Sequence, residues 1–204
     1  MALSLYCQLP FGKMHQGNPR VVALAEAMGR TPGSVALRLS NFASLDPELK
    51  ARGIVGMKGI SEAGREVWEE YYGKWETLAE HALPEVEPAQ REAPEPPEGP
   101  TDVLREVKLR RGQGFFRAAV LAAYDGKCCI TGIACDALLR ASHIVPWAED
   151  ATLRLDPRNG LCLNALHDAA FDRGLIAIGK DFELLVSKRL KDEVTGPVWE
   201  EMFA

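Results

Sequence analysis

The 204-residue sequence contains no long apolar run, only five cysteines and no excess of positive charge. No stretch approaches the roughly 18 consecutive apolar residues of a transmembrane helix, so we expect no membrane contact. Residues 1–13 lack a basic segment followed by an apolar core and a cleavage site, so no secretory signal is evident. An odd number of cysteines does not form a disulfide framework, which favours a reducing, cytoplasmic location.

The formal net charge of −5 argues by itself against non-specific binding to nucleic acid. The charges are unevenly distributed, however, because the first sixty residues carry seven Lys or Arg and only three acidic residues. This local excess would suit a surface that faces phosphates. The apolar content of 47% and the charged content of 26% are those of a globular protein, with length for one large or two modest domains.

Residues 82–100 are rich in proline and glutamate and divide the chain. Between Pro84 and Pro100 there are six prolines and five glutamates. Proline removes backbone donors and the glutamates repel one another, so this segment is expected to be an extended, semi-rigid linker. We therefore expect a helical domain over 1–81, a linker over 82–100 and a second domain over 101–204.

Two short helices are predicted in the N-terminal domain. The first begins at Asn18-Pro19 and ends at Gly29, and the second begins at Thr31-Pro32 and runs to about Phe42. Two helices joined by a glycine-containing turn look like a helix-turn-helix, whose second helix could enter a DNA groove. The alternative is a plain three-helix bundle without DNA contact.

The second of these helices has two distinct faces. Its apolar face carries Val35, Leu39 and Phe42, and another face carries Ser34, Arg38 and Asn41. Arg38 and Asn41 are therefore candidates for contact with DNA. Residues 61–80 predict a further helix whose aromatic residues pack the domain, with base stacking as the less favoured role. These are Trp68, Tyr71, Tyr72 and Trp75.

The stretch 126–178 holds the residues with the clearest chemistry. An apolar run over 137–141 ends in Ser142-His143, and a polar loop then closes on Asn159-Gly160. A strand-like segment, 161–163, and a helix-like segment, 164–172, follow. A histidine, an asparagine and a second histidine thus fall on a strand end, a loop–strand corner and a short helix. Three matches to single residues are weak evidence for a functional site. The longer pattern, which includes the apolar residues around these three positions, is much more specific.

This order of residues resembles the HNH (ββα-metal) nucleases, in which a hairpin and a helix hold a divalent cation against a scissile phosphate. The resemblance implies that His143 is the base that activates water, a task that suits the pKa of histidine. It implies that Asn159 ties the loop back to the strand and fixes the orientation of the imidazole. His167, the third member of the motif, is a candidate for catalysis. His167, Asp168 and Asp172 are candidate metal ligands on the helix.

The sequence departs from the commonest family pattern at two points. Ser142 stands where an acidic metal ligand often precedes the base, and a hydroxyl would hold a metal only weakly or through water. Paired CxxC zinc knuckles are also missing, because Thr131 stands where the second cysteine of one pair would fall. This argues against a structural zinc. The cysteines in the region are Cys128, Cys129, Cys135 and Cys162.

Basic residues flank the motif on both sides. Arg110, Arg111 and Arg117, near Gly112-Gln113-Gly114, are candidates for phosphate contact, and a solvated helix face is the equal alternative. Arg173, just after the predicted helix, is a further candidate. Segments 175–178 and 182–187 predict a β-hairpin. We assign no specific role to the remaining segment, 188–204. We expect it to pack against the core through Leu190 and Trp199.

The leading hypothesis is therefore an α+β protein that cleaves double-stranded DNA with Mg²⁺, Mn²⁺ or another divalent cation. Segments such as Pro10-Phe11-Gly12-Lys13 and 41–47 also resemble those in front of HNH domains in restriction-like proteins, which favours a restriction enzyme directed at a short sequence or a modified base. Cutting both strands with one site per chain predicts a homodimer. The alternatives are a nicking or homing-type nuclease, and a DNA-binding regulator that Ser142 has left inactive.

Overall fold

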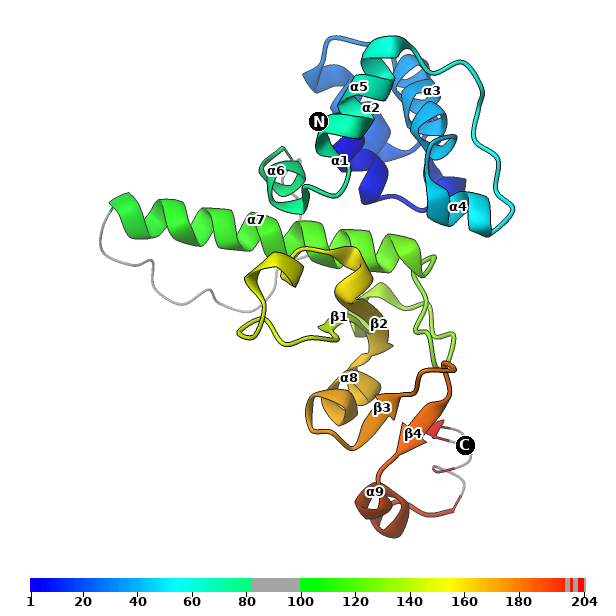
Figure 1. Ribbon diagram of the computed structural model, residues 1–204, viewed down its shortest axis with the longest axis vertical. Coiled ribbons are helices and arrows are strands. Elements are labelled where there is room, and N and C mark those ends of the chain that lie inside the picture. The colour runs from blue at the N-terminus through cyan, green and yellow to red at the C-terminus, as the bar shows by residue number, and fades with distance from the viewer. Residues whose placement is uncertain (82–99, 197–198, 200–201, 204) are drawn as a thin grey trace.

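The computed structural model describes residues 1–81, 100–196, 199 and 202–203, which fold into helices and two small antiparallel sheets (Figure 1). This confirms the α+β class. The predicted linker falls almost wholly outside the described residues. Among the described residues, no helix has the length and the apolar composition needed to cross a membrane.

The N-terminal part consists of short helices whose starts follow the predicted caps. The Asn18 side chain accepts a hydrogen bond from the Arg20 N–H at 2.9 Å, and Thr31 accepts one from the Ser34 N–H at 3.2 Å. Gly29 has a φ of 59°, the left-handed conformation that ends a helix. The elements are α1 (Ala2–Cys7), η1 (Phe11–Lys13), α2 (Pro19–Ala27), α3 (Pro32–Ala43) and α4 (Pro47–Ala51).

The two predicted helices and the buried face of the second are confirmed. Val35, Leu39 and Phe42 are at most 4% exposed, and they belong to the core that α1 and α2 share with α3. Arg38 is exposed on α3, while Asn41 is only partly so. The helix-turn-helix reading stays a prediction.

The single helix predicted over 61–80 is wrong, because the chain breaks into two helices there. Gly73, with a φ of 88°, lies at the break in a backbone conformation that glycine adopts readily. Tyr72, just before it, stacks on Trp68 with ring centroids 3.9 Å apart and meets Trp75 edge-on. Trp68, Tyr71 and Trp75 pack against the core, so the packing role expected for these aromatic residues is confirmed. The helices are α5 (Glu62–Tyr71) and α6 (Trp75–Glu80).

A long helix, α7 (Pro100–Ala123), lies between the N-terminal helices and the first hairpin (Figure 1). It takes in Gly112-Gln113-Gly114. Gly112 is buried, and a Cβ there would lie 3.2 Å from the Leu155 side chain. One cluster of buried residues runs from α1 through α7 to the first hairpin, so the two parts of the chain share a core.

The chain after α7 forms the predicted strand–strand–helix unit. Strands β1 (Leu139–His143) and β2 (Gly160–Asn164) pair antiparallel, with His143 opposite Gly160. The Asn164 side chain caps α8 (Ala165–Asp172) by accepting hydrogen bonds from the backbone N–H groups of Leu166 and His167. Three short 3₁₀ turns complete the unit: η2 (Asp136–Leu138), η3 (Ala151–Leu153) and η4 (Pro157–Asn159).

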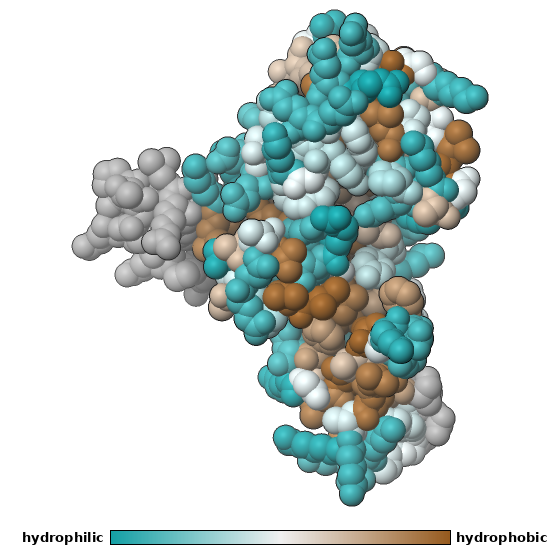
Figure 2. Space-filling view, viewed as in Figure 1, coloured by the Kyte–Doolittle hydropathy of each residue, from teal (hydrophilic) through white to brown (hydrophobic). Residues whose placement is uncertain are grey.

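The C-terminal segment forms a second hairpin and a last helix. Strands β3 (Ile176–Ile178) and β4 (Leu184–Val186) pair as predicted, and α9 (Lys188–Glu193) follows. Leu190 lies in a small core with Ala170, Ile176 and Phe203, and Trp199 packs against it, which confirms the predicted packing. Figure 2 shows apolar residues gathered below α7 over the hairpin and α8. Exposed apolar residues of this half include Leu138, Ile144, Leu166, Phe182 and Leu185.

Gly160 is required by close packing at the start of β2. A Cβ at this position would lie 2.3 Å from Cγ2 of Val120 and 3.0 Å from Cζ of Phe116, although its φ of −125° suits any residue. We expect Gly160→Ala to lower the free energy of unfolding by about 1–3 kcal/mol through overpacking, measured by denaturant unfolding. Gly114→Ala on α7, where a Cβ meets nothing within 4 Å, is the matched control.

The control should raise the free energy of unfolding by about 0.5–1 kcal/mol, because alanine favours a helix over glycine. Equal changes in the free energy of unfolding for the two substitutions would show that a Cβ at Gly160 does not overpack the core.

Candidate functional site

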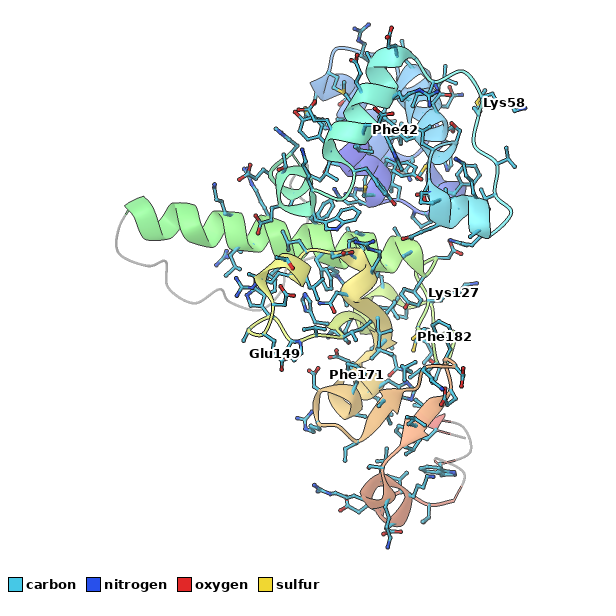
Figure 3. All side chains as sticks on the ribbon, in the orientation of Figure 1. Phe42, Lys58, Lys127, Glu149, Phe171 and Phe182 are labelled. Atoms are coloured by element: carbon cyan, nitrogen blue, oxygen red, sulfur yellow. The ribbon has the colours of Figure 1, made fainter. Side chains whose placement is uncertain are left out.

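His143 ends β1 with its imidazole held between aromatic rings. One face of the imidazole lies on the Phe116 ring of α7, with centroids 4.0 Å apart and planes 2° from parallel. Trp147 approaches at 85°, with centroids 5.6 Å apart. The side chain is only partly exposed, so these contacts leave its plane little freedom. Figure 3 labels Glu149 in the loop after β1 and Phe171 on α8, the two elements that border the site.

The hydrogen bond of His143 defines which ring nitrogen carries the proton. Nε2 lies 2.9 Å from the carbonyl oxygen of Arg154. A carbonyl oxygen can only accept, so Nε2 must donate, and the neutral ring then has its lone pair on Nδ1. An imidazole in this tautomer can take a proton from water at Nδ1.

Asn159 ties together the two ends of the loop 144–159. Its side-chain oxygen accepts a hydrogen bond from the Val145 N–H at 2.8 Å, and its amide donates to the carbonyl oxygens of Val145 and Leu153 at 3.1 and 3.2 Å. Its own carbonyl oxygen accepts from the Ile144 N–H at 2.9 Å. Leu153 directly precedes Arg154, so these bonds also support the carbonyl group that holds His143.

Asp156 secures the short turn that presents Asn159. Its carboxylate accepts hydrogen bonds from the backbone and the guanidinium of Arg158, with Nη2 at 2.5 Å. Burial alone would raise the pKa of Asp156, but the hydrogen bonds and positive charge of Arg158 bring the pKa below its usual value. The turn therefore rests on a charged pair that is ionised at neutral pH.

Ser142 and Asp168 meet between β1 and α8. The Ser142 hydroxyl, on a residue 4% exposed, donates a hydrogen bond to Oδ1 of Asp168, in the first turn of α8. Neighbouring residues of a strand point to opposite faces, so Ser142 leaves β1 toward α8 and His143 toward α7. A hydroxyl and a carboxylate are oxygen donors of the kind that Mg²⁺ takes while keeping several waters. This donor set fits a hard cation with few protein ligands.

His167 lies in a different place from the one that its sequence position suggests. It is completely buried, its Nδ1 accepts a hydrogen bond from the Asn164 amide at 2.9 Å, and its Nε2 donates to the Met202 carbonyl oxygen at 2.7 Å. Phe203 packs edge-on against the ring. Both ring nitrogens are thus occupied, and His167 joins α8 to the C-terminal segment rather than facing a cation. Asp172 is exposed, one turn beyond Asp168.

The predicted basic contacts divide into structural and exposed residues. Arg117 donates to the Leu139 carbonyl oxygen at 2.9 Å and pairs with Asp136 at 3.2 Å, so it ties α7 to the start of β1. Arg173 is exposed and donates to the Ala169 carbonyl oxygen at the end of α8. Arg110 and Arg111 are exposed on α7.

The four cysteines of this part of the chain differ in exposure. Cys128 and Cys162 are buried, whereas Cys129 and Cys135 are exposed. Burial, with the neighbouring thiols, raises the pKa of Cys162 to about 11, so this thiol is protonated at neutral pH. In the part of the chain that the structure describes, no cluster of three or more His, Cys, Asp or Glu side chains could hold a metal ion.

A cavity of about 290 Å³ lies apart from these residues, between the N-terminal helices and the α7–η4 region. Its lining includes Tyr72, Trp75 and Arg158, but not His143, Ser142 or Asp168.

Sequence reasoning missed Phe116 and Arg154. Phe116 belongs to an apolar helix pattern that signals only burial, and Arg154 acts through its backbone carbonyl, which every residue type has. Trp147 lies in the stretch 126–178, but its contact with His143 depends on how the loop after β1 folds back.

The geometry is that of a ββα unit with a histidine at the strand end, and comparison with known proteins agrees. Residues 128–179 match the family described as HNH endonuclease. This match supports an HNH-type domain over these residues and suggests a nuclease. No curated protein matches the chain. The match begins at Cys128, so α7 and the N-terminal helices lie outside it.

Proposed function

We propose that the protein is a divalent-cation-dependent DNA endonuclease in which His143 activates the attacking water. The observation that carries this proposal is the bond from Nε2 of His143 to the Arg154 carbonyl oxygen, which leaves Nδ1 as a proton acceptor at the end of β1. In the reaction, water forms a bond to phosphorus and passes a proton to Nδ1. The bond from phosphorus to one sugar oxygen breaks, and that oxygen leaves with the electron pair.

Ser142 and Asp168 would hold the cation. When bound, a divalent cation stabilises the charge that develops on the phosphate oxygens. Asp168 contributes the formal negative charge, and Ser142 orients its carboxylate by donating a hydrogen bond. A phosphodiester across the end of β1 would have the imidazole on one side and this pair on the other. Asp172 stays a further candidate ligand, and His167 supports α8 from within.

The N-terminal helices would select the target. Arg38 on the exposed face of α3 and the exposed arginines of α7, Arg110 and Arg111, would contact DNA phosphates. Recognition by the N-terminal helices and cleavage by the C-terminal part would suit a restriction enzyme that recognises a short sequence or a modified base. Cleavage of both strands would then require two chains, hence a homodimer.

Cleavage of defined DNA by the full-length protein tests this function. We expect cutting of plasmid that is unmodified, methylated or hydroxymethylated, with one class preferred, in Mg²⁺ or Mn²⁺ and with none in a chelator. Co²⁺ and Ni²⁺ extend the comparison. A protein that binds the same DNA but leaves supercoiled plasmid intact with every cation would be a regulator and not a nuclease.

A single substitution tests the contribution of α3 to DNA binding. We expect Arg38→Ala to weaken binding of all DNA sequences and to reduce the slope of log affinity against log salt by about 1, because one phosphate contact is lost. Arg189→Ala on α9, an exposed arginine paired with Glu193, is the matched control and should leave both unchanged. An unchanged salt slope in Arg38→Ala would remove α3 from the DNA interface.

A further inference from the structure

We infer that Phe116 is a positioning residue for His143. Helix α7 then contributes to the catalytic site, although it lies outside the residues that match the HNH model. This inference rests on the proposed role of His143 as base. Phe116 is 3% exposed, and its ring covers one face of the imidazole with planes 2° from parallel. Such a close stack fixes the plane in which the imidazole lies.

The stack and the Arg154 carbonyl group restrain the imidazole in complementary ways. Stacking sets the ring plane but allows rotation by half a turn, which would exchange the edges of the ring. The bond from Nε2 to the Arg154 carbonyl oxygen selects one of these orientations. The Arg154 side chain holds this carbonyl in place, since its Nε donates to the Trp147 carbonyl oxygen at 2.8 Å and its guanidinium lies over the Trp147 ring.

Phe116 is itself held firmly against the hairpin. Its Cζ would lie 3.0 Å from a Cβ at Gly160, the residue that pairs with His143, so the absence of a side chain there makes room for the ring. The next residue, Arg117, bonds to Leu139 at the other end of β1. Helix α7 thus contacts both ends of the strand that carries the base.

The preceding residue connects the same turn of α7 to the N-terminal helices. Phe115 is 1% exposed and meets Trp75 of α6, with ring centroids 6.5 Å apart. Consecutive helical residues point about 100° apart, so Phe115 faces the N-terminal helices while Phe116 faces His143. Figure 1 shows α6 and the hairpin on opposite sides of α7. Phe115→Leu is therefore a matched control that removes an equally buried ring from the other face.

Single-turnover cleavage in the full-length protein measures the positioning role. We expect Phe116→Leu, which keeps apolar bulk but removes the flat ring, to lower the rate at saturating DNA about 10²-fold with unchanged DNA affinity, because small displacements of a catalytic group have effects of this size. Phe116→Tyr should restore most of the rate. Phe115→Leu should lower the unfolding temperature with a rate near that of the wild type. A wild-type rate in Phe116→Leu, or an equal loss in Phe115→Leu, would overturn the inference.

The ¹⁵N NMR signals of the imidazole give a readout that is independent of activity. In the wild type, His143 should be protonated at Nε2 alone. In Phe116→Leu the ring plane is no longer fixed, so the bond to the Arg154 carbonyl oxygen loses its alignment and both tautomers should be sampled, with Phe115→Leu unchanged. The same tautomer in Phe116→Leu and wild type would contradict the positioning role even if the rate falls. If His143→Ala cuts as fast as the wild type, the proposed base fails instead, which separates the two conclusions. Should Phe116→Leu not fold, Phe116→Met, which also lacks a flat ring, replaces it, and an unaltered His143 tautomer and rate in that variant overturn the inference.

Discussion

His143→Ala is expected to lower the rate of DNA cleavage about 10²–10⁴-fold, the range that a positioned base contributes. The substitution removes the only side chain at the end of β1 whose described bonds leave a nitrogen lone pair, Nδ1, ready to accept a proton. It should leave DNA binding nearly unchanged, because the imidazole contacts the protein through Phe116, Trp147 and the Arg154 carbonyl group. Single-turnover cleavage of supercoiled plasmid, with DNA affinity measured in parallel, gives both quantities.

The control for this experiment is His15→Ala, because His15 is exposed and lies before α2, far along the chain from the candidate site. It should cleave as the wild type does. Since His143 also packs against Phe116, thermal unfolding must show that the His143 variant is folded. A folded His143→Ala that cleaves at the wild-type rate would exclude His143 as the base.

Asp168→Ala should have the second large effect, on the proposed requirement for a divalent cation. Loss of outer contacts around a metal typically costs 10–100-fold in affinity, so loss of the proposed carboxylate ligand should raise the Mg²⁺ concentration for half-maximal cleavage by at least about 100-fold. Asp168→Asn keeps an oxygen to accept the Ser142 hydrogen bond but loses the charge, and should resemble Asp168→Ala at limiting metal.

Asp172→Ala is the matched comparison, because Asp172 is an exposed carboxylate one turn along the same helix. It should need only slightly more Mg²⁺ than the wild type. If Asp172→Ala needed more Mg²⁺ for half-maximal cleavage than Asp168→Ala, the cation site would lie at the end of α8. His167→Ala should chiefly lower stability, since it removes the buried link from α8 to Met202.

Much of the local structure was predictable from short-range chemistry. The caps at Asn18 and Thr31, the glycine end of α2 and the order of β1, β2 and α8 depend on residues within a few positions of one another. The placement of His143 at a strand end followed from the motif, and the match of residues 128–179 to the HNH endonuclease model supports the predicted resemblance. The break at Gly73 was missed because the apolar pattern continues across it and a single glycine does not always end a helix.

The parts of the site that sequence could not give depend on contacts between distant segments. Phe116 meets His143 only because α7 packs across the hairpin, and the Arg154 carbonyl group reaches Nε2 only after Asn159 closes the loop. His167 keeps its motif position but turns inward, because Asn164 and the Met202 carbonyl group satisfy both of its nitrogens. Motif spacing alone does not distinguish a histidine that faces solvent from one that supports a helix from within.

In the proposed site, the proton acceptor and the cation act at the same place, on the two sides of the end of β1. Mn²⁺ tests it most directly, because its unpaired electrons broaden the NMR signals of nuclei close to it. Titration of the full-length protein should broaden the imidazole signals of His143 at low Mn²⁺ and leave those of His15 sharp, and Asp168→Ala should abolish the effect. Sharp His143 signals at Mn²⁺ concentrations that support cleavage would show that the cation lies elsewhere and would contradict the proposed site.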